Sequence, residues 1–171
     1  MNVELGEYTV RLMRPNDEAQ IQALFESDPD YFRIVQGAPP GPAEAKDLIS
    51  DLPEGKEDRD KFVYIIFDSH GVVIAVVDLI RGYPSDEIWF LGLLFVAPAN
   101  RNMGLGTRVL EAICVHVRQQ GGLAIRLGVV HENVGARALY DRAGFHFIYE
   151  RKRAYTNGFS VMIDVLERTL E

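Results

Sequence analysis

Residues 95–108, with the sequence FVAPANRNMGLGTR, restrict the folds open to this chain more than any other segment does. They follow an apolar run over residues 88–96 and precede apolar residues at helical spacing, which predicts a strand, a turn and the start of a helix. Pro98 cannot donate to a strand ladder, so the strand ends there. The fold therefore has to join a strand to a helix through an open turn that contains glycine.

The turn itself has the features of an anion-binding site. Gly104 and Gly106 let a ligand approach the backbone closely, and the first turn of a helix leaves its N–H groups unpaired and partly positive. Arg101 and Arg108 add formal positive charge. The turn predicts a phosphate or pyrophosphate site, and an ordinary glycine turn is the alternative. The predicted site consists of Arg101, Asn102, Met103, Gly104, Leu105, Gly106 and Thr107.

The spacing Arg101-x-x-Gly104-x-Gly106 resembles the cofactor-binding motif R/Q-x-x-G-x-G/A of the GNAT superfamily, the acetyl-CoA-dependent N-acyltransferases. Two other glycine motifs fit less well. Val109 stands where the Rossmann fingerprint has its third glycine, and no lysine follows Gly106 as a P-loop requires. The resemblance implies that the ligand is acetyl-CoA, bound as the acetyl donor.

A second motif lies at residues 133–145, NVGARALYDRAGF, which resemble the family's N-x-x-A-x-x-L-Y-x-x-x-G-F helix at every named position. Asn133 is a good N-cap, and Gly144 fits the left-handed residue that closes a helix. Apolar residues between them recur at helical spacing. A core helix without a function is the alternative for this segment alone, but two motifs in the family's order favour the family.

The composition is that of an ordinary globular chain. Its 171 residues suggest a single N-acetyltransferase domain over residues 1–171, and 47% hydrophobic residues with 25% charged residues exclude a disordered chain. A net charge of -7 argues against broad nucleic-acid binding. Because Cys114 is the single cysteine, we expect no intramolecular disulfide and no thiolate zinc cluster. The sequence shows no signal peptide and no membrane span, which makes the cytoplasm the expected location.

Periodicity and turn signals predict the other elements. Expected strands lie at residues 8–14, 62–67, 72–79, 88–96, 123–130, 145–151 and 159–166, with helices starting at Pro15, Ala43, Gly106 and Asn133 and a Pro/Gly-rich loop at residues 27–42. This order predicts an α/β single-domain GNAT-like fold. Its central sheet is mixed and mostly antiparallel, with about seven strands and about four flanking helices. A dinucleotide-binding fold would instead alternate strands and helices throughout.

The resemblance also implies roles for residues near the two motifs. In the family, the strand before the phosphate turn bulges away from its neighbour, and its backbone holds pantetheine and the thioester carbonyl; by position these residues are Leu94, Phe95 and Val96. Tyr140 matches the family's frequent general acid, and Asn133 matches a pantetheine contact. The implied reaction is direct attack of a primary amine on acetyl-CoA in a ternary complex.

The general base is the position at which the sequence departs from the family. Many members carry a glutamate on the strand before the turn, but residues 90–93 are apolar here. Glu87, just upstream, is the candidate catalytic base, and Asp86 and Asp78 are further candidates. A solvated carboxylate at a strand end is the alternative for each of them, and a chain of waters is another route for the proton.

Aromatic residues in loops are the candidates for acceptor binding, because loops carry binding groups more often than the scaffold does. Aromatic residues that only cover a helix-to-sheet junction are the alternative. Asp86, Glu87 and the acidic total would suit a cationic amine, either a small molecule or a peptide amino terminus. The expected acceptor-binding residues are Tyr31, Phe32, Arg33, Tyr83 and Trp89.

The sequence leaves two other functions open. A non-catalytic acyl-CoA sensor would keep the cofactor motif without transferring anything; the apolar strand favours this function, whereas Tyr140 opposes it. A Rossmann-type nucleotide binder would bind NAD in place of acetyl-CoA. The identity of the acceptor, the use of longer acyl-CoA donors and the oligomeric state, with a homodimer as one option, are not fixed by the sequence.

Overall fold

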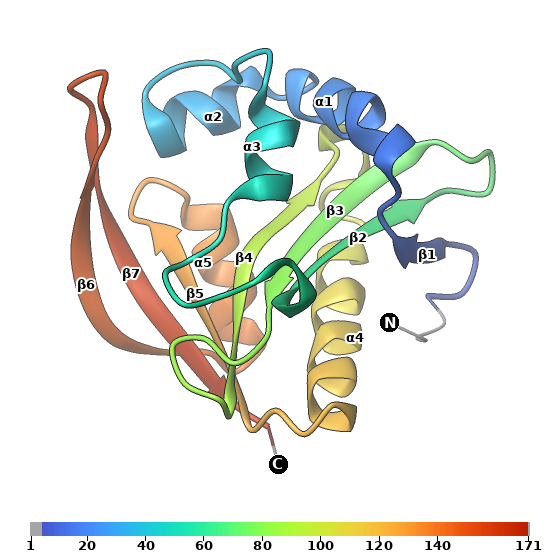
Figure 1. Ribbon diagram of the computed structural model, residues 1–171. Helices are drawn as coiled ribbons and strands as arrows, with labels where there is room; N and C mark the ends of the chain where they lie inside the picture. The colour runs from blue at the N-terminus through green and yellow to red at the C-terminus, as the bar shows by residue number, and fades with distance from the viewer. Residues whose placement is uncertain (1–4, 171) are drawn as a thin grey trace.

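A seven-stranded sheet forms the centre of the computed structural model, which describes residues 5–170 (Figure 1). The strands are β1 (Thr9–Leu12), β2 (Lys61–Phe67), β3 (Val73–Ile80), β4 (Ile88–Val96), β5 (Ala124–Val130), β6 (His146–Ala154) and β7 (Ser160–Thr169). Their order is β1-β2-β3-β4-β5-β7-β6, and each neighbouring pair is antiparallel except β4 and β5. The mostly antiparallel sheet confirms the α/β GNAT-like fold and excludes the doubly wound parallel sheet of a Rossmann-type binder.

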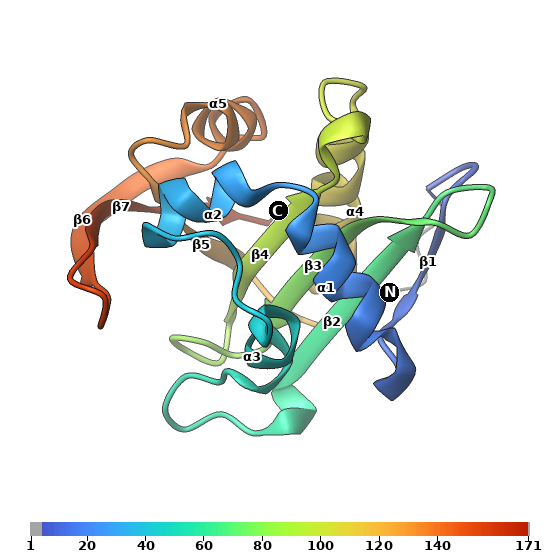
Figure 2. The ribbon, with the colours of Figure 1, turned by 90° about the horizontal axis from the view of Figure 1, so that it is seen from above.

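Helices cover both faces of this sheet. They are α1 (Glu18–Glu26), α2 (Pro29–Gln36), α3 (Glu44–Ser50), α4 (Leu105–Gln119) and α5 (Val134–Arg142). Figure 2 shows α1, α2 and α3 over one face and α4 and α5 over the other. Side chains alternate between the two layers, so Ile66 packs in the core beneath α4 while Ile65 packs in the core beneath α1. Among the described residues, no helix is both long enough and apolar enough to cross a membrane.

The helix α2 corrects the expected loop at residues 27–42 and brings the number of α-helices between residues 5 and 170 to five. Asp28 caps it by accepting a hydrogen bond from the Tyr31 N–H at 3.1 Å, and Pro29 occupies its first turn. Gly37, with φ of 78°, ends it. Proline and glycine therefore mark the two ends of a short helix here, although the same residues are typical of loops.

The two central strands part halfway along the sheet. β4 and β5 pair only from Ile88 and Ala124 as far as Leu91 and Leu127. On the other edge of β4, the pairing with β3 shifts and leaves Gly92 as an extra residue, which is a β-bulge. A Cβ atom at this position would lie 2.5 Å from the Asp78 carboxylate, so the Asp78 side chain can occupy this place only because residue 92 is glycine. The bulge bends β4, and the gap between β4 and β5 opens beyond it.

Candidate active site

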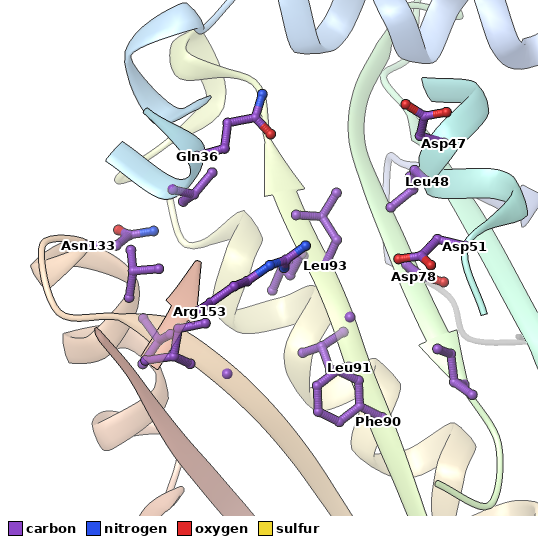
Figure 3. Close-up of a pocket in the computed structure, with 18 of the residues that line it drawn as sticks. Gln36, Asp47, Leu48, Asp51, Asp78, Phe90, Leu91, Leu93, Asn133 and Arg153 are labelled. Carbon is purple, nitrogen blue, oxygen red and sulfur yellow. The ribbon is translucent and has the colours of Figure 1, made fainter. Parts of the chain in front are cut away.

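A cavity of about 910 Å³ lies where β4 and β5 part (Figure 3). Leu93 and Leu94 of β4 and residues 128–130 of β5 line it, together with side chains from α2, α3, α5 and β6. Within residues 5–170, β4 has no strand partner on its β5 side beyond Leu91. Its backbone N–H and C=O groups there are consequently available to a ligand, as the bulged strand of the family would require.

The glycine turn, residues 101–106, follows β4 after a short 3-10 turn at Pro98–Asn100 and includes the first two residues of α4. Asn102 and Gly104 have φ values of 60° and 81°, and left-handed residues let successive backbone N–H groups face one concavity. Nothing lies within 4 Å of the position that a Cβ would take at Gly104. At Gly106 a Cβ would contact only Leu139, at 3.4 Å. The protein therefore leaves this surface bare, which fits a diphosphate that approaches the backbone.

Both arginines of this region are bound by other parts of the chain. Arg101 donates from Nε to the Val96 carbonyl at 2.9 Å, and its Nη2 lies 2.6 Å from an Asp28 carboxylate oxygen. Arg108 donates to the Leu5 carbonyl. Arg101 thus connects the turn to the start of α2, and Arg108 connects the first turn of α4 to Leu5. A phosphate role for Arg101 stays a prediction.

The three residues predicted to contact the thioester lie at the end of β4. Leu94 lines the cavity. Phe95 is only 2% exposed, and its ring packs against Phe25 and Tyr31 with centroids 5.3 and 5.2 Å away. Val96 supplies the carbonyl that Arg101 binds. Any contact of Phe95 with a ligand therefore has to come from its backbone, whereas the Val96 carbonyl is already bound by Arg101.

A bulkier residue at position 106 tests the phosphate site. We expect Gly106→Val to weaken acetyl-CoA binding at least about tenfold, because its methyl groups would cover N–H groups that otherwise donate to charged oxygens. Gly106→Ala is the matched control, because the motif allows alanine there and its Cβ would make only an ordinary contact with Leu139. Calorimetry of both folded variants measures the effect. Equal affinities for all three proteins would contradict this placement of the pyrophosphate.

The helix α5 places Asn133 and Tyr140 on the cavity wall. The Asn133 side-chain oxygen accepts a hydrogen bond from the Ala136 N–H at 3.2 Å, which caps the helix and leaves the side-chain NH₂ as a donor. Tyr140 is buried, and its hydroxyl has no hydrogen-bond partner among residues 5–170. Burial raises the pKa of Tyr140, so its hydroxyl stays protonated at neutral pH.

Asp78 is a carboxylate inside the cavity, beside the bulge at Gly92. The residue is 5% exposed, and Lys61 Nζ lies 3.1 Å from each of its oxygens. Only the contact with Oδ2 has hydrogen-bond geometry, so Oδ1 is buried without a hydrogen bond from the described residues. Burial raises the pKa of Asp78, and the positive charge of Lys61 partly opposes this shift. A carboxyl group with a raised pKa is a better proton acceptor than an ordinary one.

Glu87 and Asp86 lie elsewhere. Both are exposed in the segment before β4, at the opposite end of this strand from the glycine turn (Figure 1), and neither lines the cavity. The Glu87 carbonyl accepts a hydrogen bond from the Leu123 N–H at 2.8 Å, which joins the starts of β4 and β5. The catalytic role of Glu87 stays a prediction from the sequence.

The structure brings three of the five expected acceptor-binding residues to the cavity. Tyr31, Phe32 and Tyr83 line it. Arg33 is exposed and pairs with Asp30 at 2.6 Å. Trp89 is 1% exposed and stacks on Phe62 with centroids 5.4 Å apart, so its side chain belongs to the core beneath α4.

Charged residues that the sequence reasoning missed also line the cavity. They are Glu44, Asp47 and Asp51, in and just after α3, and Arg151 and Arg153 on β6. The alternation of residues 149, 151, 153 and 155 was a signal that these side chains share one face of a strand. Which face meets the cavity depends on how β6 pairs with β7, and no local pattern specifies that pairing.

The bulged strand β4 parts from its parallel neighbour β5, leads to a glycine turn and faces a buried tyrosine. Together these features define the fold of acetyl-CoA-dependent acyltransferases. The family comparison agrees with this class. The model of the acetyltransferase (GNAT) family matches residues 21–145. The chain belongs to this family, whose members are N-acetyltransferases.

Individual relatives support the assignment. The chain is 28% identical over 141 residues to the uncharacterized N-acetyltransferase YhfO of Bacillus subtilis (strain 168), with 80% of this chain and 88% of that protein covered. An acetyltransferase structure from Thermus thermophilus matches with a TM-score of 0.75 at 20% identity, covering 98% and 100% of the two chains. A spermidine N-acetyltransferase from Vibrio cholerae, solved with CoA and spermine, matches with a TM-score of 0.75 at 17% identity over 96% of each chain. The two structural matches show a shared fold.

Proposed function

We propose that this protein transfers an acetyl group from acetyl-CoA to a primary amine by direct attack in a ternary complex. The observation that carries the proposal is the cavity between β4 and β5, which contains both Tyr140 and Asp78 beside the unpaired edge of β4. An acid, a base and a binding edge for the donor would thus meet at one place. The cytoplasm stays the predicted location.

The residues present fit acetyl-CoA. The backbone of residues 102–107 would hold its pyrophosphate, and the open surface at Gly104 and Gly106 supports this placement. The β4 edge at Leu93 and Leu94 and the side-chain NH₂ of Asn133 would bind the pantetheine arm. When bound, acetyl-CoA supplies an activated acetyl thioester and a thiolate leaving group.

Two side chains would move protons. We favour Asp78 over Glu87 as the base, because Asp78 lines the cavity and Glu87 lies outside it. Asp78 would accept the proton of the acceptor's ammonium group, either directly or through water, and so generate the neutral amine. The Tyr140 hydroxyl would donate its proton to the departing sulfur, and its raised pKa keeps that proton available. The nitrogen would lose its second proton as the amide forms, and this proton would restore the Tyr140 hydroxyl, directly or through water.

A panel of primary amines with acetyl-CoA tests the proposal. We expect release of CoA that depends on the amine, and a product heavier than the acceptor by one acetyl group. The alternative, a non-catalytic acyl-CoA sensor, predicts acetyl-CoA binding without CoA release for every amine. That result from a folded protein that binds acetyl-CoA would contradict acetyl transfer and support the sensor.

A further inference from the structure

Side chains of opposite charge occupy the two sides of the cavity. Figure 3 shows Asp47, Asp51 and Asp78 on the α3 and β3 side of β4, and Arg153 on the other side, pointing toward Leu93. Arg151, two residues earlier on β6, lines the same cavity. We call Asp47, Asp51 and Asp78 the acidic wall and Arg151 and Arg153 the basic wall. A molecule that fills this space would contact the acidic wall at one end and the basic wall at the other.

The arginines of the basic wall form no ion pair with a carboxylate of the described residues. Glu44 of α3 also lines the cavity, and its charge acts on Tyr155, but its side chain accepts hydrogen bonds from the Gln36 side chain and the Gly41 N–H. Among residues 5–170, neither Arg151 nor Arg153 forms an ion pair, and the Arg153 guanidinium carbon lies 4.7 Å from the centroid of the Tyr155 ring. Most of the other arginines among residues 5–170 form ion pairs with Asp or Glu. Two guanidinium groups without a partner at one cavity wall favour an anionic ligand group.

The basic wall is also held in place. At the tip of the β6–β7 hairpin, Asn157 donates to the Gln36 carbonyl of α2 at 3.1 Å. The Phe159 ring packs against Gly37 at the end of α2. A Cβ atom at Gly37 would lie only 2.3 Å from this ring. These contacts fix the hairpin against α2, so the arginines of β6 face the cavity from a supported strand.

The acidic wall has an excess of negative charge. Lys61 compensates Asp78, whereas the carboxylates of Asp47 and Asp51 have no ion pair among residues 5–170. Asp51 is close enough for its charge to raise the pKa of Asp78 further. An ammonium group beside these carboxylates would be stabilised, and it would sit next to the bulge where we place the acetyl transfer.

We propose that the acceptor is a small zwitterionic amine, whose amino group binds at Asp78 and Asp51 and whose carboxylate or phosphoryl group binds at Arg151 and Arg153. This inference rests on the proposed acetyl transfer and adds the class of acceptor. β6 lies four strand positions from β3 in the sheet, on the far side of the opening between β4 and β5, so the two walls are well separated. The long arginine side chains extend across part of this separation. We therefore expect the anionic group of the acceptor to lie several bonds from its amino group.

Matched acceptors test the class directly. Linear ω-amino carboxylates of increasing length are compared with the corresponding ω-amino amides and diamines at saturating acetyl-CoA. We expect kcat/KM for the best carboxylate to exceed that of its amide at least about tenfold, since hydrogen bonds between charged groups are lost in the amide. The diamine should be no better than the amide. ω-Amino phosphonates distinguish a phosphoryl site from a carboxylate site.

Variants of β6 assign the preference to the arginines. In Arg153→Gln and Arg151→Gln, the ratio of kcat/KM between carboxylate and amide should fall toward one. Lys152→Gln removes the same charge from the same strand, but residue 152 does not line the cavity, so the ratio should not change. Calorimetry of the carboxylate and the amide with the CoA-bound protein gives a second readout that needs no turnover.

The outcomes separate this inference from the proposed function. If acetyl-CoA binds but no amine is acetylated, acetyl transfer fails, and calorimetry still decides whether the carboxylate is bound in preference to the amide. Equal kcat/KM and equal affinity for carboxylate and amide would overturn the zwitterionic acceptor. Arginine variants that weaken only acetyl-CoA binding would overturn it too, because the guanidinium groups would then belong to the donor site.

Discussion

Replacing Tyr140 by phenylalanine is expected to lower turnover roughly ten- to a thousandfold, within or below the usual range for a positioned acid. The ring keeps its place against Phe145, with centroids 5.7 Å apart, so only the proton donor is removed. Since the hydroxyl has no hydrogen-bond partner among residues 5–170, thermal stability should change little. Steady-state kinetics at saturating acetyl-CoA, with chemistry shown to limit the rate, measures the effect.

Tyr64→Phe is the matched control for a tyrosine that serves only the core. The Tyr64 hydroxyl lies 3.2 Å from His116 Nε2, so its removal should lower the melting temperature and leave turnover of the folded enzyme near normal. If Tyr140→Phe gives the same pattern as Tyr64→Phe, the acid role is wrong. Acetyl-CoA affinity should match that of the wild type in both variants.

The sequence predicted the parts of the fold and site that depend on neighbouring residues. The glycine turn and the capped helix α5 each form from a few consecutive residues, so their motifs specify backbone conformation directly. The strand pattern likewise predicted the seven-stranded sheet, because the alternation of polar and apolar residues shows which face of a strand is buried. Tyr140 faces the cavity for the same reason, since its place is fixed by helical spacing from Asn133.

Residues whose positions depend on strand pairing were not predictable in this way. Asp78 reaches the cavity because β4 bulges at Gly92, and the bulge is a property of two strands together. Trp89 was expected to bind the acceptor although it lies within the expected strand at residues 88–96; it is the second residue of β4, and its side chain faces the core. Arg151 and Arg153 depend on the pairing of β6 with β7. The acceptor side of the site is built from such pairings, which explains why the donor side was easier to predict.

The largest loss of activity is expected for Asp78→Asn. If Asp78 takes the amine proton, its replacement should reduce kcat by about a hundred- to ten-thousandfold, because the amide keeps the shape but cannot accept the proton. Burial raises the Asp78 pKa above its ordinary value of 3.8, and the carboxyl group is a base only when ionised. Wild-type kcat should therefore fall as pH drops through this raised pKa, and the variant should lack that acid limb.

Lys61→Gln separates a catalytic Asp78 from a merely structural one. The positive charge of Lys61, 3.1 Å away, lowers the Asp78 pKa, so its removal should shift the acid limb of kcat to higher pH while keeping the carboxylate. If the pair of Asp78 and Lys61 is only structural, Asp78→Asn and Lys61→Gln should both lower stability, and neither should alter the pH profile of kcat. Thermal unfolding beside kcat profiles at saturating acceptor distinguishes the two cases. A folded Asp78→Asn protein with the wild-type pH profile of kcat would contradict Asp78 as the base and leave Glu87 or water as the candidates.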